Sequence, residues 1–99
     1  MNKVLPIGSI VLLTNGTKPV MIFGYLQESM RDENGFVDYI GVPYPEGNIN
    51  ASLQIGFQMN DIREVLFEGY RSEEFRPFEL LLKLAETRYL GSEESNTEE

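Results

Sequence analysis

The chain has 99 residues and a formal net charge of -8, from 16 acidic and 8 basic side chains, and it contains no histidine, cysteine or tryptophan. These absences exclude Ser-His-Asp triads, histidine metal ligands, disulfides, zinc fingers and cysteine nucleophiles. Hydrophobic residues make up 41% of the chain, which is enough for the core of one small globular domain.

The acidic balance argues against nucleic acid as a partner, because affinity for nucleic acids depends on cations that neutralise phosphates. The same argument disfavours anionic membrane surfaces. No apolar run approaches the ~20 residues that span a bilayer, and Pro6 and Gly8 interrupt the short apolar stretch near the N-terminus, unlike a signal peptide. We therefore expect a cytoplasmic protein that binds neither nucleic acid nor membrane.

The first half of the chain predicts three antiparallel strands joined as a meander. Residues 9–14 and 17–26 are rich in apolar and β-branched side chains and flank Asn15-Gly16. This dipeptide predicts a type I′ hairpin turn with positive φ at both residues. A second turn over residues 30–35 leads to a third strand over residues 36–42.

The second half begins with turn chemistry over residues 43–48, where two prolines and a glycine stop regular structure. Residues 49–58 are ambiguous between strand and helix, and their partial alternation favours a strand. A short turn over residues 60–62 precedes a strand over residues 63–68, which Gly69 ends.

A helix is predicted near residue 77, because Pro77 suits the first helical position. One apolar stripe follows it at helical spacing: Phe78, Leu81, Leu82, Ala85 and Tyr89. We expect Phe78, Leu81 and Leu82 to pack on the sheet. Leu80 and Leu84 are surplus to one face, which indicates contact with another chain.

The last residues, GSEESNTEE, contain no large apolar side chain and four glutamates, so residues 90–99 are predicted to be a disordered acidic tail. Residues 1–89 then form a single small domain. The fold class is α+β, with four to five antiparallel strands forming a bent sheet or a small SH3-like open barrel, followed by one C-terminal helix.

Possible chemistry is limited to carboxylates and serines. The segment Asp32–Gly35 lacks the spaced ligands of a calcium loop, and the acids of Asp61–Glu64 are better explained by a solvated turn. No motif brings a lysine near a serine to activate it. We expect no catalytic, cofactor-binding or metal-binding residues, and no enzyme activity.

The tyrosines carry more information about partners. Tyr25, Tyr39, Tyr44 and Tyr70 lie near predicted strand ends and turns. Tyrosine serves both small cores and protein interfaces, because it combines a large apolar area with a polar tip. Both uses stay open for these four residues.

Several segments resemble a family of small acidic bacterial proteins known only as a domain of unknown function. They include Leu5–Leu13, Asp38–Gly41, Tyr44–Asn48 and Val65–Tyr70, and the likeness covers about residues 4–75. The family is found in type VII secretion gene clusters of Gram-positive bacteria, beside LXG toxins and their small helical partners. The start of the chain, Pro-x-Gly-x-x-Val-x-Leu followed by a turn, is also similar to the start of many SH3-like barrels.

The resemblance implies a non-enzymatic adaptor or chaperone that binds such a toxin, or its helical partner, in the cytosol. Its expected protein-binding residues are Tyr44, Glu46, Asn48, Glu68, Tyr70, Leu80 and Leu84. Three alternatives stay open: an immunity protein that neutralises a cognate toxin, an enzyme that uses carboxylates or a bound metal, and a homo-oligomer built on the helix or a strand edge.

Overall fold

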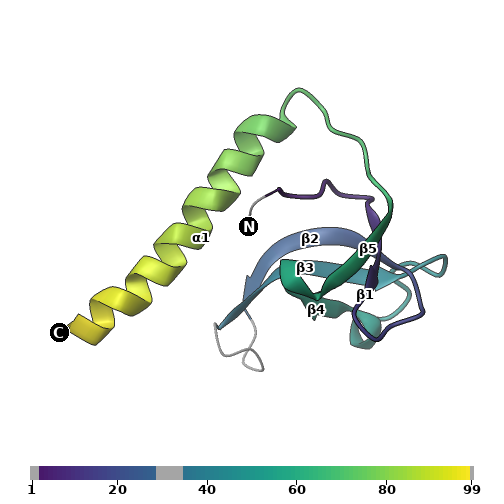
Figure 1. The fold of residues 1–99 in the computed structure, drawn as a ribbon, viewed down its shortest axis with the longest axis horizontal. Coiled ribbons are helices and arrows are strands. Elements are labelled where there is room, and N and C mark those ends of the chain that lie inside the picture. Colours follow the sequence, from purple (N-terminus) through teal and green to yellow (C-terminus); the bar gives the residue numbers. More distant parts are fainter. Residues whose placement is uncertain (1–2, 29–34, 99) are drawn as a thin grey trace. The chain divides into compact units, whose positions relative to one another are not determined.

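The computed structural model describes residues 3–28 and 35–98, with side chains as far as Thr87 (Figure 1). The chain forms two compact units, one of residues 5–70 and one that joins residues 1–4 to residues 71–99. The turn expected over residues 30–35 lies outside the described residues, except for Gly35.

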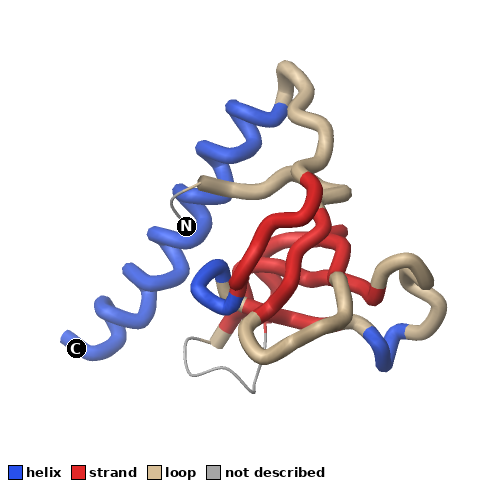
Figure 2. The backbone as a smooth tube through the Cα atoms, turned by 45° about the vertical axis from the view of Figure 1, so that its right-hand side comes forward, coloured by secondary structure: helices blue, strands red, loops and turns tan. Residues whose placement is uncertain are grey.

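The unit of residues 5–70 is a five-stranded antiparallel sheet with the strand order β4-β3-β2-β1-β5 (Figures 1 and 2). The strands are β1 (Ile10–Leu13), β2 (Val20–Glu28), β3 (Phe36–Pro43), β4 (Ile55–Phe57) and β5 (Ile62–Phe67). Within the described residues β4 and β5 form the two edges, so the sheet is open. The predicted α+β class with five antiparallel strands is confirmed.

The sheet is bent along β2, which Figure 1 shows as a long curved strand. The pairing of β2 with β3 shifts register between Ile22 and Gly24, as at a β-bulge. Leu26 then adopts a positive φ of 46°. A bulge bends its strand and increases the local twist, which lets the long strand curve over the core.

The first turn differs from its prediction. Asn15 has a φ of 65°, but Gly16 is not among the residues with positive φ. The N–H of Gly16 donates to the carbonyl of Leu13 at 2.9 Å, so Asn15 is the third residue of this turn. Positive φ at the third position alone marks a type II turn and excludes type I′.

The reason for the difference lies in the neighbouring strands. The pairing of β1 with β2 ends at Val11 and Val20, so eight residues separate the paired positions. Leu12 and Leu13 pair only with β5, which lies along the other edge of β1. A tight Asn-Gly hairpin would need these two residues to pair with β2 as well, and the chain leaves β2 before they do.

The ambiguous segment 49–58 contains both kinds of structure. Asn50 caps a short 3-10 helix, η1 (Ala51–Leu53), by accepting a hydrogen bond from the N–H of Ser52 at 2.9 Å. The short strand β4 follows. The turn predicted before the last strand is a second 3-10 helix, η2 (Met59–Asp61), where Asp61 Oδ2 accepts a hydrogen bond from the N–H of Gln58 at 2.9 Å.

The core of the sheet is centred on β3, whose residues are buried on both faces. Tyr39 is fully buried, and its ring packs against Phe57 and Tyr25 with centroid distances of 5.5 and 5.8 Å. Tyr44 and Tyr70, in contrast, are exposed. The four tyrosines therefore divide between core and surface.

The unit of residues 1–4 and 71–99 contains the helix α1 (Phe75–Glu98). It begins two residues before Pro77, which therefore lies within the first turn and not at the first position. The first four N–H groups of a helix have no partner within it, so proline is tolerated there. The tail predicted from residue 90 on lies outside the residues whose side chains are described.

The buried face of α1 is not the predicted apolar stripe. Leu82 is buried as expected, but Phe78 and Leu81 are exposed, and the other buried residue among the described part of the helix is Glu79. Phe78 and Leu81 were expected to be buried like Leu82, and this expectation is wrong. Hydrophobic spacing identifies the most apolar face of a helix. The buried face of α1 is a different one, because it contains Glu79, which is held there by polar contacts. Within the described residues, no helix is long and apolar enough to cross a membrane.

Candidate protein-binding surface

The most unusual surface of the sheet is the edge strand β5. It pairs with β1 on one side, and the described part of the chain places no strand on its other side. Val65 and Leu66 are 45% and 46% exposed, and Phe67 is 58% exposed. Side chains on both faces of this strand are thus open to solvent. An exposed apolar edge is a template for pairing with another chain, and soluble proteins normally protect such edges.

The residues after β5 extend this apolar surface. The N–H of Gly69 donates to the buried hydroxyl of Ser9 at 2.9 Å, and this bond holds the end of β5 against the start of β1. Tyr70, the next residue, is 84% exposed. We refer to Val65, Leu66, Phe67 and Tyr70 as the β5 surface.

The structure explains why a glycine stands at position 69, within the segment Val65–Tyr70 that resembles the family. A Cβ atom at this position would collide with the carbonyl oxygen of Ile7 and lie 3.0 Å from the N–H nitrogen of Ser9. Both are backbone atoms of a paired segment, which cannot move aside as a flexible side chain would. The glycine therefore permits the close approach of two backbones. Tyr70 follows it directly in the chain and is exposed.

Gly69→Ala is accordingly expected to lower the free energy of unfolding by about 1–3 kcal/mol, the usual cost of overpacking. Urea denaturation followed by circular dichroism measures this change. Gly24→Ala is the matched control, since its Cβ would meet Ile40 Cβ at an ordinary 3.6 Å, and we expect little change there. Equal effects in the two variants would contradict the steric argument.

The second predicted segment, Tyr44–Asn48, forms a turn whose polar side chains have local partners. The N–H of Gly47, at a φ of 80°, donates to the carbonyl of Pro43 at 2.7 Å. Glu46 forms an ion pair with Lys18 at 2.8 Å, and Asn48 Oδ1 accepts a hydrogen bond from Gln54 at 3.1 Å. The hydrogen bond from Lys18 lowers the pKa of Glu46 below its ordinary value.

The structure does not bring these two predicted segments together. Both β3 and β5 are antiparallel to a neighbour, and along the order β3-β2-β1-β5 the strand directions alternate, so β3 and β5 run in opposite directions. The turn after β3 and the segment after β5 therefore leave the sheet in opposite directions. Leu80 and Leu84 are exposed four residues apart on one face of α1, in the other unit.

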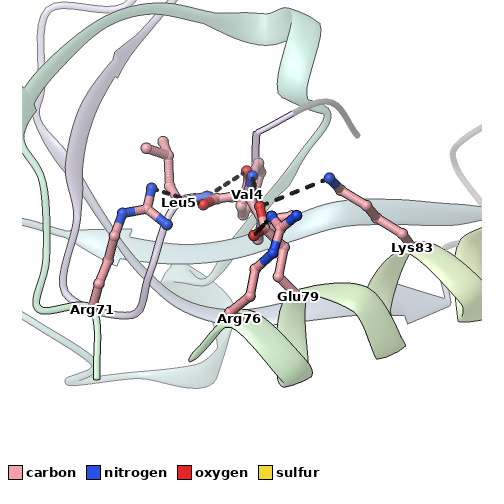
Figure 3. Close-up of polar contacts among 7 residues, drawn as sticks. Val4, Leu5, Arg71, Arg76, Glu79 and Lys83 are labelled. Atoms are coloured by element: carbon pink, nitrogen blue, oxygen red, sulfur yellow. Dashed lines mark hydrogen bonds and ion pairs between the residues drawn. The ribbon is translucent and has the colours of Figure 1, made fainter. Parts of the chain in front are cut away.

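In the helical unit, a buried carboxylate organises the contacts of α1 (Figure 3). Glu79 is 5% exposed, and its Oε2 accepts a hydrogen bond from the N–H of Val4 at 3.1 Å. Arg76 donates to Oε1 at 3.2 Å, and the ammonium of Lys83 lies 4.0 Å from Oε2. A glutamate with Arg at i−3 and Lys at i+4 is a detectable helical charge pattern, but no local signal reveals that it is buried.

The hydrogen bond from the Val4 N–H is the main reason that the pKa of Glu79 lies below its ordinary value of 4.5. Burial raises this pKa, while the hydrogen bond from Arg76 and the charge of Lys83 lower it further. The carboxylate is therefore charged near neutral pH, and its protonation removes the preferred acceptor of a buried N–H group.

A carboxyl whose pKa is depressed on folding stabilises the fold above its unfolded pKa and loses this contribution as the pH falls through the folded pKa. We therefore expect the difference in unfolding free energy between wild type and Glu79→Gln to shrink as the pH falls below about 4.5. Urea titrations of both proteins at a series of pH values measure it. A difference independent of pH would show that the charge of Glu79 does not contribute.

The fold and the β5 surface define a small α+β protein with an open sheet and an apolar edge strand. The chain belongs to the family described as a domain of unknown function, DUF4176, whose model matches residues 4–77. The match spans all five strands, the segment after β5 and the first residues of α1. No curated protein and no solved structure matches the chain significantly.

Proposed function

We propose that this protein is a non-enzymatic adaptor or chaperone that binds a type VII secretion substrate in the cytosol, either an LXG-type toxin or its helical partner. The single observation that carries the binding role is the β5 surface, where three consecutive apolar side chains and Tyr70 are exposed on an edge strand. The type VII assignment rests on the resemblance of the motif segments, and the family itself has no established function.

An edge strand can bind a partner by strand addition, in which main-chain hydrogen bonds supply affinity and side chains on alternate faces supply selectivity. The β5 surface offers both components, because one edge of the strand has no neighbour among the described strands and its apolar residues are open on both faces. The exposed leucines of α1, Leu80 and Leu84, supply a separate apolar face suited to a helical partner.

Asp61 and Glu64 are the two acids that the sequence considered for paired carboxylate chemistry. Asp61 caps η2 by accepting a hydrogen bond from the N–H of Gln58, and Glu64 lies exposed on β5. The capping contact gives Asp61 a structural role, which is compatible with the proposed binding function.

The alternative is an immunity protein, and the net charge of -8 favours it, because acidic proteins are steered towards basic toxin sites. The two functions differ in the part of the toxin that is bound. Co-purification with the N-terminal export region of an LXG toxin is expected for the adaptor. Binding to the C-terminal toxic region, with protection from toxicity, would overturn the adaptor proposal in favour of immunity.

Two tyrosine variants locate the binding surface. Tyr70→Ala is expected to weaken capture of the export region about tenfold, as truncation of an interface anchor does. Tyr44→Ala is the matched control, because Tyr44 is also exposed but follows β3, which runs opposite to β5. Loss of binding in Tyr44→Ala with no change in Tyr70→Ala would assign the site to the turn over residues 43–48.

Phe67→Lys tests the edge itself, since a lysine on an exposed strand edge opposes pairing with another strand. Phe67 is more than half exposed, so this change is expected to leave the stability of the sheet nearly unaltered. Light scattering on the free protein shows whether β5 is already occupied by a second copy. Undiminished capture by monomeric Phe67→Lys would contradict strand addition at β5.

A further inference from the structure

The register between β5 and β1, which lie side by side in Figure 1, decides which side chains of the edge strand share a face. The register shifts twice along this pair, so the plain alternation of a regular strand does not hold for β5. Leu12 pairs with Glu64, and Ile10 pairs with Phe67. Directly paired residues project to the same face, and Ile10 and Leu12 are two positions apart on β1. All four side chains therefore share one face of the sheet, which we call the Glu64 face.

The Glu64 face is the more open of the two faces along β5. On the opposite face Val65 pairs with Val11, which is fully buried. On the Glu64 face, Phe67 is 58% exposed, Glu64 is exposed, and the two β1 residues are partly exposed. This face therefore presents three apolar side chains and one carboxylate to whatever binds the edge.

Glu64 is also the charged group of this edge that a partner meets. The strands β1 and β5 contain two charged residues, Arg63 and Glu64. Arg63 Nη2 donates to the carbonyl of Gly16 at 3.0 Å, so this guanidinium is engaged with the turn that follows β1. The Glu64 carboxylate forms no hydrogen bond or ion pair with any residue that the structure describes. It is thus available to a cation on a bound chain.

A second copy of this chain is a poor occupant of the edge. Each copy carries a net charge of -8, and the pairing of two β5 strands brings two Glu64 carboxylates to the same short edge. Like charges that face each other across a strand pair are destabilising. Charges on edge strands are one way in which soluble proteins oppose self-pairing. The charge of Glu64 therefore favours a partner of opposite charge over a second copy.

We propose that β5 binds an extended partner segment in which apolar residues flank a lysine or arginine, and that this basic side chain pairs with Glu64. Main-chain hydrogen bonds of an added strand are independent of its sequence, so the side chains of the Glu64 face supply the selectivity. Opposite charges across a strand pair attract, and apolar residues of the segment pack on Phe67 and Leu12. The inference rests on the proposed function, because it names the chemistry of the segment that this edge captures.

Titration of the full chain with three synthetic peptides, followed by amide NMR, tests the proposal. The peptides have blocked ends and the sequence Thr-Val-Xaa-Val-Thr, in which Xaa is lysine, glutamine or glutamate. Shifts confined to β5 and β1 are expected. The lysine peptide should bind about two- to fivefold more tightly than the glutamine peptide, as for other cross-strand charge pairs, and the glutamate peptide most weakly. Equal affinity for the three peptides, or shifts confined to α1, would overturn the proposal.

Glu64→Lys is expected to reverse the order, so that the glutamate peptide binds most tightly, because the pair is restored with its charges exchanged. Glu64 is exposed, so the stability of the sheet should stay close to that of wild type. Glu73→Lys is the matched control, since it makes the same change of charge at an exposed position outside the sheet. This variant should keep the preference for the lysine peptide. A reversed preference in Glu73→Lys would identify a general charge effect and contradict the pairing with Glu64.

The toxin export region separates this inference from the proposed function. If Glu64→Lys captures that region as strongly as wild type while Tyr70→Ala does not, the basic partner segment is wrong and the adaptor function stands. If wild type does not capture the region but prefers the lysine peptide, the adaptor function fails and the charge selectivity of β5 stands. Light scattering that shows a dimer of wild type and a monomer of Phe67→Lys would assign β5 to a second copy and overturn the inference.

Discussion

Replacement of Tyr39 by alanine is expected to lower the free energy of unfolding of the sheet by about 3–5 kcal/mol, the cost of deleting a buried aromatic ring. Tyr39 is 0% exposed and packs between Tyr25 and Phe57. Its removal leaves a cavity at the centre of the core, where β3 joins its two neighbours. Urea denaturation followed by circular dichroism is the direct measurement.

The hydroxyl of Tyr39 contributes separately from its ring. It accepts a hydrogen bond from the N–H of Leu5 at 3.1 Å, while the hydroxyl of Tyr25 donates to the carbonyl of the same residue at 2.6 Å. Tyr39→Phe keeps the ring but leaves a buried N–H without this acceptor, so a smaller loss of about 1–2 kcal/mol is expected. Both tyrosines thus hold the segment before β1 against the sheet.

Tyr70→Ala is the control for the tyrosine series, because Tyr70 is 84% exposed. A change within about 0.5 kcal/mol is expected there, as for most surface substitutions. If Tyr39→Ala and Tyr70→Ala destabilised the protein equally, the division of the tyrosines between core and surface would be wrong.

Glu79→Ala is expected to destabilise the helical unit by about 2–3 kcal/mol, because a buried N–H loses a charged acceptor. The N–H of Val4 loses the acceptor that it has in the wild type, and Arg76 and Lys83 lose the carboxylate between them. The far-ultraviolet signal of the helix during urea denaturation reports the change. Hydrogen exchange of the Val4 amide should become faster in the same variant.

Glu73→Ala removes the same charge from an exposed position near the start of α1 and is the matched control. We expect its stability to lie within about 0.5 kcal/mol of wild type. A comparable loss in Glu73→Ala would mean that overall charge near the helix start, and not the buried contact with Val4, accounts for the effect.

The strands were predictable because their signals are local. Apolar runs bounded by glycine, proline and asparagine mark β1, β2 and β3, and the predicted ranges agree with the structure to within a few residues. The short turn before β5 was also predictable. The segment over residues 49–58 was not, because a three-residue strand such as β4 carries too little periodicity to separate it from the 3-10 helix beside it.

The candidate site was only partly accessible from the sequence. We predicted that Tyr44, Tyr70, Leu80 and Leu84 bind a protein partner. All four are exposed, as residues that contact a partner must be. The exposed apolar residues of β5 were not predicted, because the sequence indicates only a strand over residues 63–68 and not its place in the sheet. Their exposure depends on β5 being an edge strand, and strand order is set by long-range pairing.

The helix illustrates the same limit. Its presence follows from apolar residues at helical spacing, yet its buried residues include Glu79, while Phe78 and Leu81 are exposed. The contact between Val4 and Glu79 was likewise not predictable, since it forms only when the N-terminal segment meets the helix.

The sequence by itself determined most of the element types, their approximate ranges and the absence of histidine and cysteine chemistry, because these depend on composition and on neighbours a few residues apart. The tertiary structure alone decided which tyrosine is buried, which strand is an edge and which helix residues are buried. The deciding contacts join residues 34 positions apart, as between Leu5 and Tyr39, or 75 apart, as between Val4 and Glu79. Local patterns carry no information on such pairs, because their partners are chosen by the assembled fold.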